Sequence, residues 1–184
     1  MGYQCRRIVN LISDIFCRSV SREVNMHDIV KKRMTAEVEG DFVVFLIGMR
    51  INKLWKIHKW LPVALAMPKM LTELYKNSQL GFMGHEQWMG RTTIMVQYWK
   101  SFEHLERYAK DKASKHLPAW AEFNKKVSSN GDVGIWHESY LLKNKNYECL
   151  YNNMPVFGLA KATNHIPVTD KIKSARDRLN AEIT

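Results

Sequence analysis

The sequence predicts an α+β fold, and three observations along the chain lead to that prediction. Residues 42–51 form a nearly continuous apolar run rich in branched side chains, which is typical of a strand covered on both faces. Helical spacing of apolar residues follows at 55–77 and again from Phe102. Strand-like runs occupy 80–100 and 133–142. The order strand, helix, strand, strand, helix, strand is that of a ferredoxin-like βαββαβ unit.

Turn and capping residues divide these elements. In the helix at 55–77, Pro62 suits a first turn and Pro68 predicts a break or a kink. Gly90 divides the run at 80–100 into the two strands of a hairpin.

The second half of the unit carries similar signals. Ser101 is a fair N-cap for a helix running to about Lys112. Pro118 opens a further helix at 119–128, and Gly131 leads into the last strand.

The chain divides into three regions by pattern. We expect an N-terminal amphipathic helical arm at 1–35, a ferredoxin-like barrel domain at 36–159 and a basic C-terminal tail at 160–184. We expect the arm to pack on its own domain or on a partner chain. The alternative, a helix on a membrane surface, is favoured by four arginines and weakened by two acidic residues. The residues at 147–151 suit an edge strand.

Composition excludes several classes of protein. The 184 residues, 46% hydrophobic and 25% charged, suit one soluble globular domain. Two prolines and a lysine interrupt the most apolar stretch, 61–74, which excludes a spanning helix there. The first twenty residues lack the pattern of a secretory signal, so we expect a cytoplasmic protein. The three cysteines form neither a C-x-x-C pair nor an even set, which argues against disulfides and a cysteine zinc site.

The net charge of +10 is spread along the chain, with most of the surplus at its two ends. No basic helix with base-reading residues and no phosphate-binding glycine motif accompanies it. We therefore expect no nucleic-acid partner.

Two strands predict an assembly. The runs at 42–51 and 91–99 are apolar on both faces, whereas the helices of such a unit cover only one face of its sheet. A second copy of the chain is the simplest cover for the other face. We therefore predict a homodimer.

Polar residues on the strands are candidates for chemistry. His137 lies in the middle of the last strand, and His116 stands just before a helix start. A core imidazole bonded to the backbone is the alternative for His137. Arg50, after Gly48 at a strand end, suits a carboxylate, either of a ligand or of Glu86.

Three motifs carry a family resemblance. Residues 98–109, 115–118 and 135–140 resemble the second half of the dimeric α/β-barrel superfamily related to antibiotic-biosynthesis monooxygenases. The stretch 42–159 is similar to a group of bacterial monooxygenase-like proteins related to a fungal fumagillin-pathway monooxygenase. The same motifs are more remotely similar to spheroidene monooxygenase and to haem-containing aldoxime dehydratases.

The resemblance implies a haem site. His116 matches the histidine that binds haem iron in the dehydratases, and His137 matches the one that faces the substrate. It implies a catalytic role for His137. Arg50, from its place at the strand end, is a second candidate catalytic residue that could bind a carboxylate or a haem propionate. Such a site also needs a hydrophobic pocket, and the residues that we expect to line it are Trp99, Trp120, Met95 and Phe82. The dehydratases contain two fused repeats and this chain only one, which separates it from their activity.

The resulting hypothesis is a haem-dependent monooxygenase-type oxidoreductase that acts on a hydrophobic small molecule and receives electrons from a separate donor. Three alternatives stay open: a cofactor-free barrel monooxygenase in which His137 removes a proton, a haem-dependent dehydratase, and a non-catalytic barrel that binds a ligand.

Overall fold

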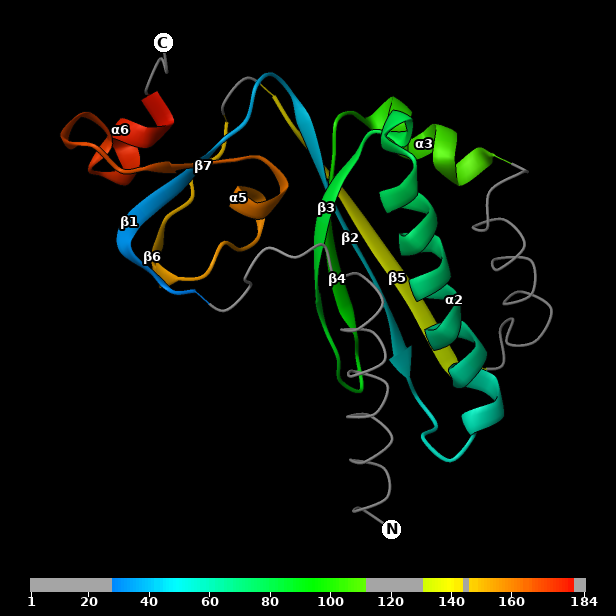
Figure 1. Cartoon of the computed structure of the whole chain (residues 1–184). Helices are drawn as coiled ribbons and strands as arrows, with labels where there is room; N and C mark the ends of the chain where they lie inside the picture. Colours follow the sequence, from blue (N-terminus) through cyan, green and yellow to red (C-terminus); the bar gives the residue numbers. More distant parts are fainter. Residues whose placement is uncertain (1–27, 112–130, 144–145, 181–184) are drawn as a thin grey trace.

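A four-stranded antiparallel sheet in the order β3-β4-β2-β5 forms the centre of the computed structural model, which describes residues 28–111, 131–143 and 146–180. Its strands are β2 (Phe42–Ile51), β3 (Phe82–Trp88), β4 (Ile94–Trp99) and β5 (Val133–Leu142). The helices α2 (Ile57–Lys76) and α3 (Phe102–Lys110) lie on one side of the sheet (Figure 1). The predicted α+β fold with its strand and helix order is confirmed.

β2 lies between two partners, as its apolar run predicts. All ten of its residues align with β5, from Phe42 opposite Leu142 to Ile51 opposite Val133. Its middle residues align with β4 on the other edge. Val43 faces α2 and α3 while Phe42 faces away from them, and both are 2% exposed. Apolar residues on both faces of β2 are therefore buried at this end of the strand.

The long helix α2 continues through both of its prolines, so the expected break is wrong. Pro68 removes one backbone donor, and the hydroxyl of Thr72 donates to the Pro68 carbonyl at 2.8 Å. Leu71 and Leu74 beyond Pro68 are buried against the sheet, as Trp60 is before it. Packing on both sides of the proline outweighs the loss of one hydrogen bond.

The shorter helix α3 begins at its predicted cap. The Ser101 hydroxyl accepts a hydrogen bond from the His104 amide at 3.4 Å. The helix at 119–128, together with His116 and Trp120, lies outside the described residues.

A second, three-stranded sheet differs from the prediction. Its order is β6-β1-β7, with β1 (Val30–Glu37) paired antiparallel to β6 (Tyr151–Met154) and to β7 (Asn164–Pro167). Residues 30–35 of the expected helical arm are thus a strand, and residues 1–27 lie outside the described part. Residues of the expected tail supply β7. The remaining short elements are η1 (Ser78–Leu80), α5 (Leu159–Ala162), η2 (Asp170–Ile172) and α6 (Ala175–Asn180).

The second sheet covers part of the sheet face that the helices leave bare. Phe42, Val44 and Tyr98 of the large sheet pack with Ala36 and Leu159 in one hydrophobic cluster. Part of the cover that a second copy was expected to supply therefore comes from the two ends of this chain. The domain boundaries 1–35, 36–159 and 160–184 stay a prediction.

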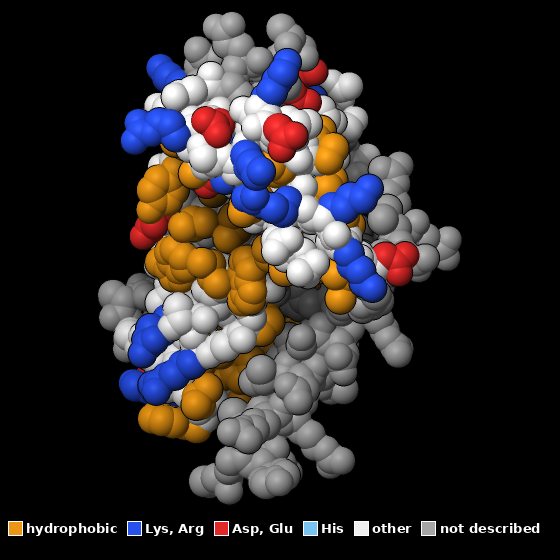
Figure 2. Space-filling model, turned by 90° about the vertical axis from the view of Figure 1, so that its left-hand side faces the viewer, with side chains coloured by type: hydrophobic (Ala, Val, Ile, Leu, Met, Phe, Trp, Pro, Cys, Tyr) orange, Lys and Arg blue, Asp and Glu red, His pale blue; other side chains and the backbone are white. Residues whose placement is uncertain are grey.

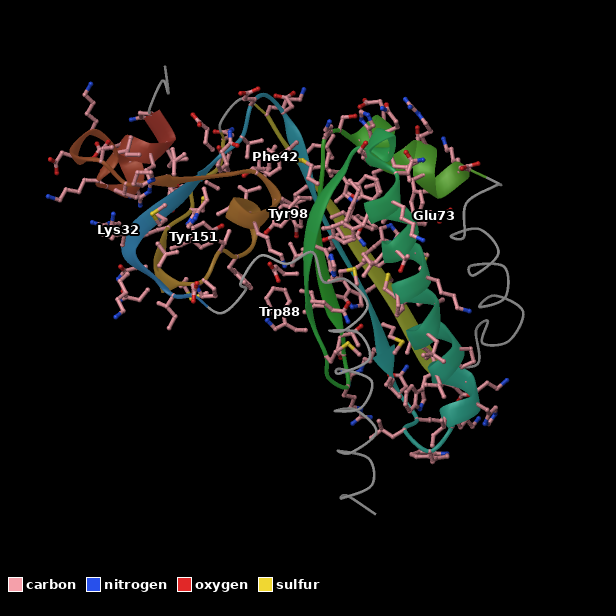
Figure 3. The ribbon with its side chains drawn as sticks, viewed as in Figure 1. Lys32, Phe42, Glu73, Trp88, Tyr98 and Tyr151 are labelled. Atoms are coloured by element: carbon pink, nitrogen blue, oxygen red, sulfur yellow. The ribbon has the colours of Figure 1, made fainter. Side chains whose placement is uncertain are left out.

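Tyr98 of β4 and Tyr151 of β6 join the two sheets (Figure 3). At Gly158, whose φ is +61°, a Cβ would lie 3.4 Å from the hydroxyl oxygen of each. The Gly158 amide donates to Glu86 at 3.1 Å, and the Lys161 ammonium lies 3.3 Å from the same carboxylate oxygen. Burial, with the nearby Glu86 charge, raises the pKa of Tyr98 to about 12. Tyr98 is therefore a neutral phenol at physiological pH.

A buried carboxylate fixes the opposite end of the large sheet. Asp132, which is 2% exposed, lies 2.8 Å from the ammonium groups of both Lys53 and Lys56. Its backbone carbonyl accepts hydrogen bonds from the amides of Asn52 and Lys53. The start of β5 is thereby fastened to the loop between β2 and α2.

Among the described residues, no helix is long and apolar enough to cross a membrane.

We expect Asp132→Asn to lower the melting temperature, because the isosteric amide leaves Lys53 and Lys56 without their anion. Lys53 first, and then Lys56, hold the pKa of Asp132 below its ordinary 3.8. The stabilisation from this group is therefore complete above pH 3.8 and is lost as pH falls through the lower folded value. Asp170→Asn, at an exposed carboxylate beside Lys173, is the matched control. Equal thermal melts of the two variants across this pH range would contradict the prediction.

Candidate functional site

The layer between the large sheet and α2 contains the candidate site. His137 of β5 aligns with Ile47 of β2, and Ile47 packs in the core cluster under α2. Side chains that align on neighbouring strands share a face, so His137 points to the helix side of the sheet. Strand alternation in the sequence places His137 on one face with Ile135 and Ser139, and the register with β2 shows that this face is the helix side.

The surroundings of His137 are open and partly aromatic. Its side chain is exposed, and its ring centroid lies 5.7 Å from that of Phe45. No hydrogen bond reaches its imidazole from any residue that the structure describes. Ser139 and Leu141, next on the same face of β5, are exposed too. An imidazole so placed can ligate a metal or exchange a proton with a bound molecule.

The residues expected to line a pocket belong to the packed hydrophobic core of this layer. Trp99 is fully buried and Met95 is 4% exposed, both packed under the helices. Phe82 of β3 makes an edge contact with Trp99 at 5.3 Å between ring centroids. The Trp99 indole donates to Gln97, whose amide donates to the Met95 sulfur. Three of the four predicted pocket residues are thus neighbours, and Trp120 lies outside the described residues.

Arg50 is not brought together with His137. It aligns with Gly134, three residues from His137 along β5, and therefore lies on the opposite face of the sheet. Its guanidinium donates to the Thr92 hydroxyl at 2.6 Å. The alternative partner, Glu86, is paired with Lys161 instead. Arg50 and His137 do not reach the same molecule within one layer.

A tyrosine–histidine pair at the other edge of this layer was not anticipated. Tyr75 of α2 lies with its hydroxyl 2.9 Å from Nδ1 of His85 on β3, and both rings contact Phe82. Burial, and then the charge of Lys161, lowers the pKa of His85 to about 4. The imidazole is therefore neutral near pH 7, and its tautomer determines whether the phenol or the ring N–H donates in this hydrogen bond. Alternation on β3 indicates the face of His85, but only the position of α2 supplies its partner.

Polar side chains occupy both edges of the layer and apolar ones its middle. In one row across the sheet, Gln87 aligns with Met95, and Ile47 aligns with both Met95 and His137. The Gln87 side-chain oxygen is buried and receives no hydrogen bond from the described part of the chain. Packed core side chains fill the apolar middle of the layer, and its polar groups lie at the two edges.

Comparisons with known proteins agree with this architecture. A family model described as monooxygenase af470-like matches residues 42–159. Monooxygenase af470 of Aspergillus fumigatus is 24% identical over an alignment that covers 70% of this chain. The chain spans 53% of that relative, or about half its length.

Two aldoxime dehydratase structures, one in complex with butyraldoxime, superpose with TM-scores of 0.52. They are 15% and 17% identical, and the alignments cover 88% of this chain and 46% and 48% of theirs. At this identity they show a shared fold.

We expect His85→Gln to change how stability depends on pH. Wild-type His85 has a folded pKa of about 4, below the ordinary 6.5, so the unfolded chain binds the extra proton between these values. Stability of the wild type should therefore fall as pH drops from 6.5 to 4, by at most about 1.4 kcal/mol per pH unit from this group. Urea melts across this range should show a smaller slope for His85→Gln. His58→Gln, at an exposed histidine, is the control, and an unchanged slope in His85→Gln would contradict the assignment.

Proposed function

Because this chain belongs to the monooxygenase af470-like family, which its residues 42–159 match, we propose that it is a monooxygenase-type oxidoreductase acting on a hydrophobic small molecule. The observation that carries the proposal is the position of His137, an exposed imidazole on the same sheet face as Phe45 and the exposed Leu141. These apolar neighbours suit an apolar substrate, and the imidazole suits its reacting group.

The described residues fit the haem that the family resemblance implies. The helix-side face of β5 has an exposed imidazole, an adjacent aromatic ring in Phe45 and an exposed leucine, Leu141. These are the contacts that a flat, apolar ring system with a polar centre makes in proteins. His116, which is predicted as the axial ligand, would hold the iron. Bound haem would supply the chemistry of oxygen activation, with electrons from a separate donor protein.

His137 then acts as the acid or base of the site. A neutral imidazole accepts a proton from substrate or from an oxygen species, and the protonated form returns it. Phe45 limits one side of the ring. Arg50 lies on the other face, where it suits a partner chain or a carboxylate instead of the same substrate.

A homodimer is part of the proposal. The face of the large sheet opposite the helices is covered at one end by the second sheet, while Leu46 of β2 and Val96 of β4 are half-buried beyond it. Figure 2 shows hydrophobic side chains gathered on the side of the molecule that includes this face. A second copy seated there would remove the apolar surface from water.

The proposed histidine roles are tested by substitution. His116→Ala should abolish haem retention, because the iron loses its protein bond, and His137→Ala should retain haem but lower turnover about 10²–10⁴-fold. Absorption spectra after haem reconstitution and oxygen uptake with apolar substrates are the measurements. His58→Ala is the control.

Each other result has a distinct meaning. Loss of haem with His137→Ala and retention with His116→Ala would mean that His137 is the axial ligand and His116 the acid or base. A wild-type protein that takes up no haem rejects the haem assignment and leaves a cofactor-free monooxygenase, provided that His137→Ala impairs oxygen uptake. If neither substitution changes activity or ligand binding, the chain is a non-catalytic ligand-binding barrel.

The dimer has its own test. Light scattering at micromolar concentration should give twice the mass of the chain, and Leu46→Arg should shift it towards the monomer, because a charge is then placed on the covered face. Leu150→Arg, at an exposed leucine outside the large sheet, is the control. A wild-type monomer would reject the dimer without bearing on the haem experiment.

A further inference from the structure

The loop between β2 and α2 exposes an apolar group at the end of the molecule remote from the second sheet (Figure 1). Trp55 is 76% exposed, more than any other large hydrophobic side chain of the described residues. Leu54 and Ile57 beside it are 37% and 41% exposed. Large apolar side chains that cluster on a surface mark an interaction site more often than single ones do.

This loop is held in place by several hydrogen bonds. The Asn52 amide donates to the Asp132 carbonyl at 3.1 Å, and the guanidinium of Arg91 donates to the Asn52 carbonyl at 3.2 Å. The indole of buried Trp60 donates to the Leu54 carbonyl at 3.0 Å. The backbone on both sides of Trp55 is therefore fixed, and docking it against a partner requires little further ordering.

Basic residues surround the exposed indole. Among the described residues, this loop and the element ends that meet it carry five basic side chains and one acidic side chain, Asp132. Asp132 is buried beneath two of the lysines. We call the following residues the basic tip: Arg50, Lys53, Leu54, Trp55, Lys56, Ile57, Lys59 and Arg91. The first turn of α2 contains no acidic residue, so the positive end of the helix dipole adds to this charge.

We propose that the basic tip docks on the surface of a membrane that contains anionic lipids, with Trp55 at the level of the headgroups. Indole rings favour the membrane–water interface, and each lysine or arginine near an anionic surface adds to the attraction. Leu54 and Ile57 favour hydrocarbon, whereas a surface for nucleic acid would present further rings for bases to stack on. Two copies of the tip would repel each other by charge, which disfavours a second copy as the occupant.

The proposal concerns a surface and does not rest on the proposed oxidoreductase activity. The test is co-sedimentation of the full chain with phosphatidylcholine vesicles, with and without phosphatidylserine. Wild type should sediment with the anionic vesicles, less so as salt shortens the screening length from about 10 Å at 0.1 M to about 3 Å at 1 M. Its binding to pure phosphatidylcholine should be at least about tenfold weaker.

Substitutions place the binding at the tip. Trp55→Ser should weaken sedimentation at least about tenfold, since the indole no longer enters the interface, whereas Leu150→Ser at an exposed leucine elsewhere should not. Lys59→Glu should weaken it about tenfold or more, and Lys171→Glu, with the same change in net charge at an exposed site of η2, should have little effect. Circular dichroism checks that each variant is folded.

Three results overturn the proposal. They are no binding to anionic vesicles, equal binding of wild type and Trp55→Ser, and equal loss in the Lys59 and Lys171 variants, which would indicate net charge alone. Tighter binding of the tip to a single-stranded oligonucleotide than to the vesicles, lost in Trp55→Ser, would identify nucleic acid as the occupant instead.

Discussion

The double coverage of β2 is the constraint on which the rest of the structure depends. This strand is hydrogen-bonded on both edges, by β4 and β5, and its two faces carry apolar side chains along most of its length. One face requires α2 and α3, and the other requires a cover that a single βαββαβ unit does not contain. The second sheet covers part of that face. The candidate site lies on the helix side because His137 points to that face of the sheet.

Much of the large sheet could be predicted from sequence because its signals are local. β5 begins and ends where its run of residues predicts, and Ser101 caps α3 as expected. The second sheet could not be predicted, because β1 finds its partners more than a hundred residues away. Within β1, three consecutive basic residues conceal the alternation of a strand and fit the polar face of a helix equally well. Only tertiary pairing decides between these two conformations.

The candidate site likewise has features that the sequence predicts and features that depend on tertiary packing. Strand alternation places His137 and Arg50 on opposite faces, a separation that the sequence already contains. The contact of Tyr75 with His85 depends on how α2 lies across β3, and no spacing in the sequence encodes that. The same is true of Asp132, which reads in the sequence as an ordinary turn residue before a strand and lies buried between two lysines.

In the second sheet, β1 lies between β6 and β7, two strands that follow it by more than a hundred residues. β1 is therefore synthesised well before either of its partners. When β1 leaves the ribosome, neither β6 nor β7 has yet been made, so its edges stay unpaired until those two strands follow. The large sheet has all its strands by Leu142 and can close earlier. Closing the second sheet then joins segments more than a hundred residues apart, a slow step because contacts distant in sequence form late. A nascent chain stalled shortly after β5 would expose two unpaired edges of β1, which are templates for aggregation.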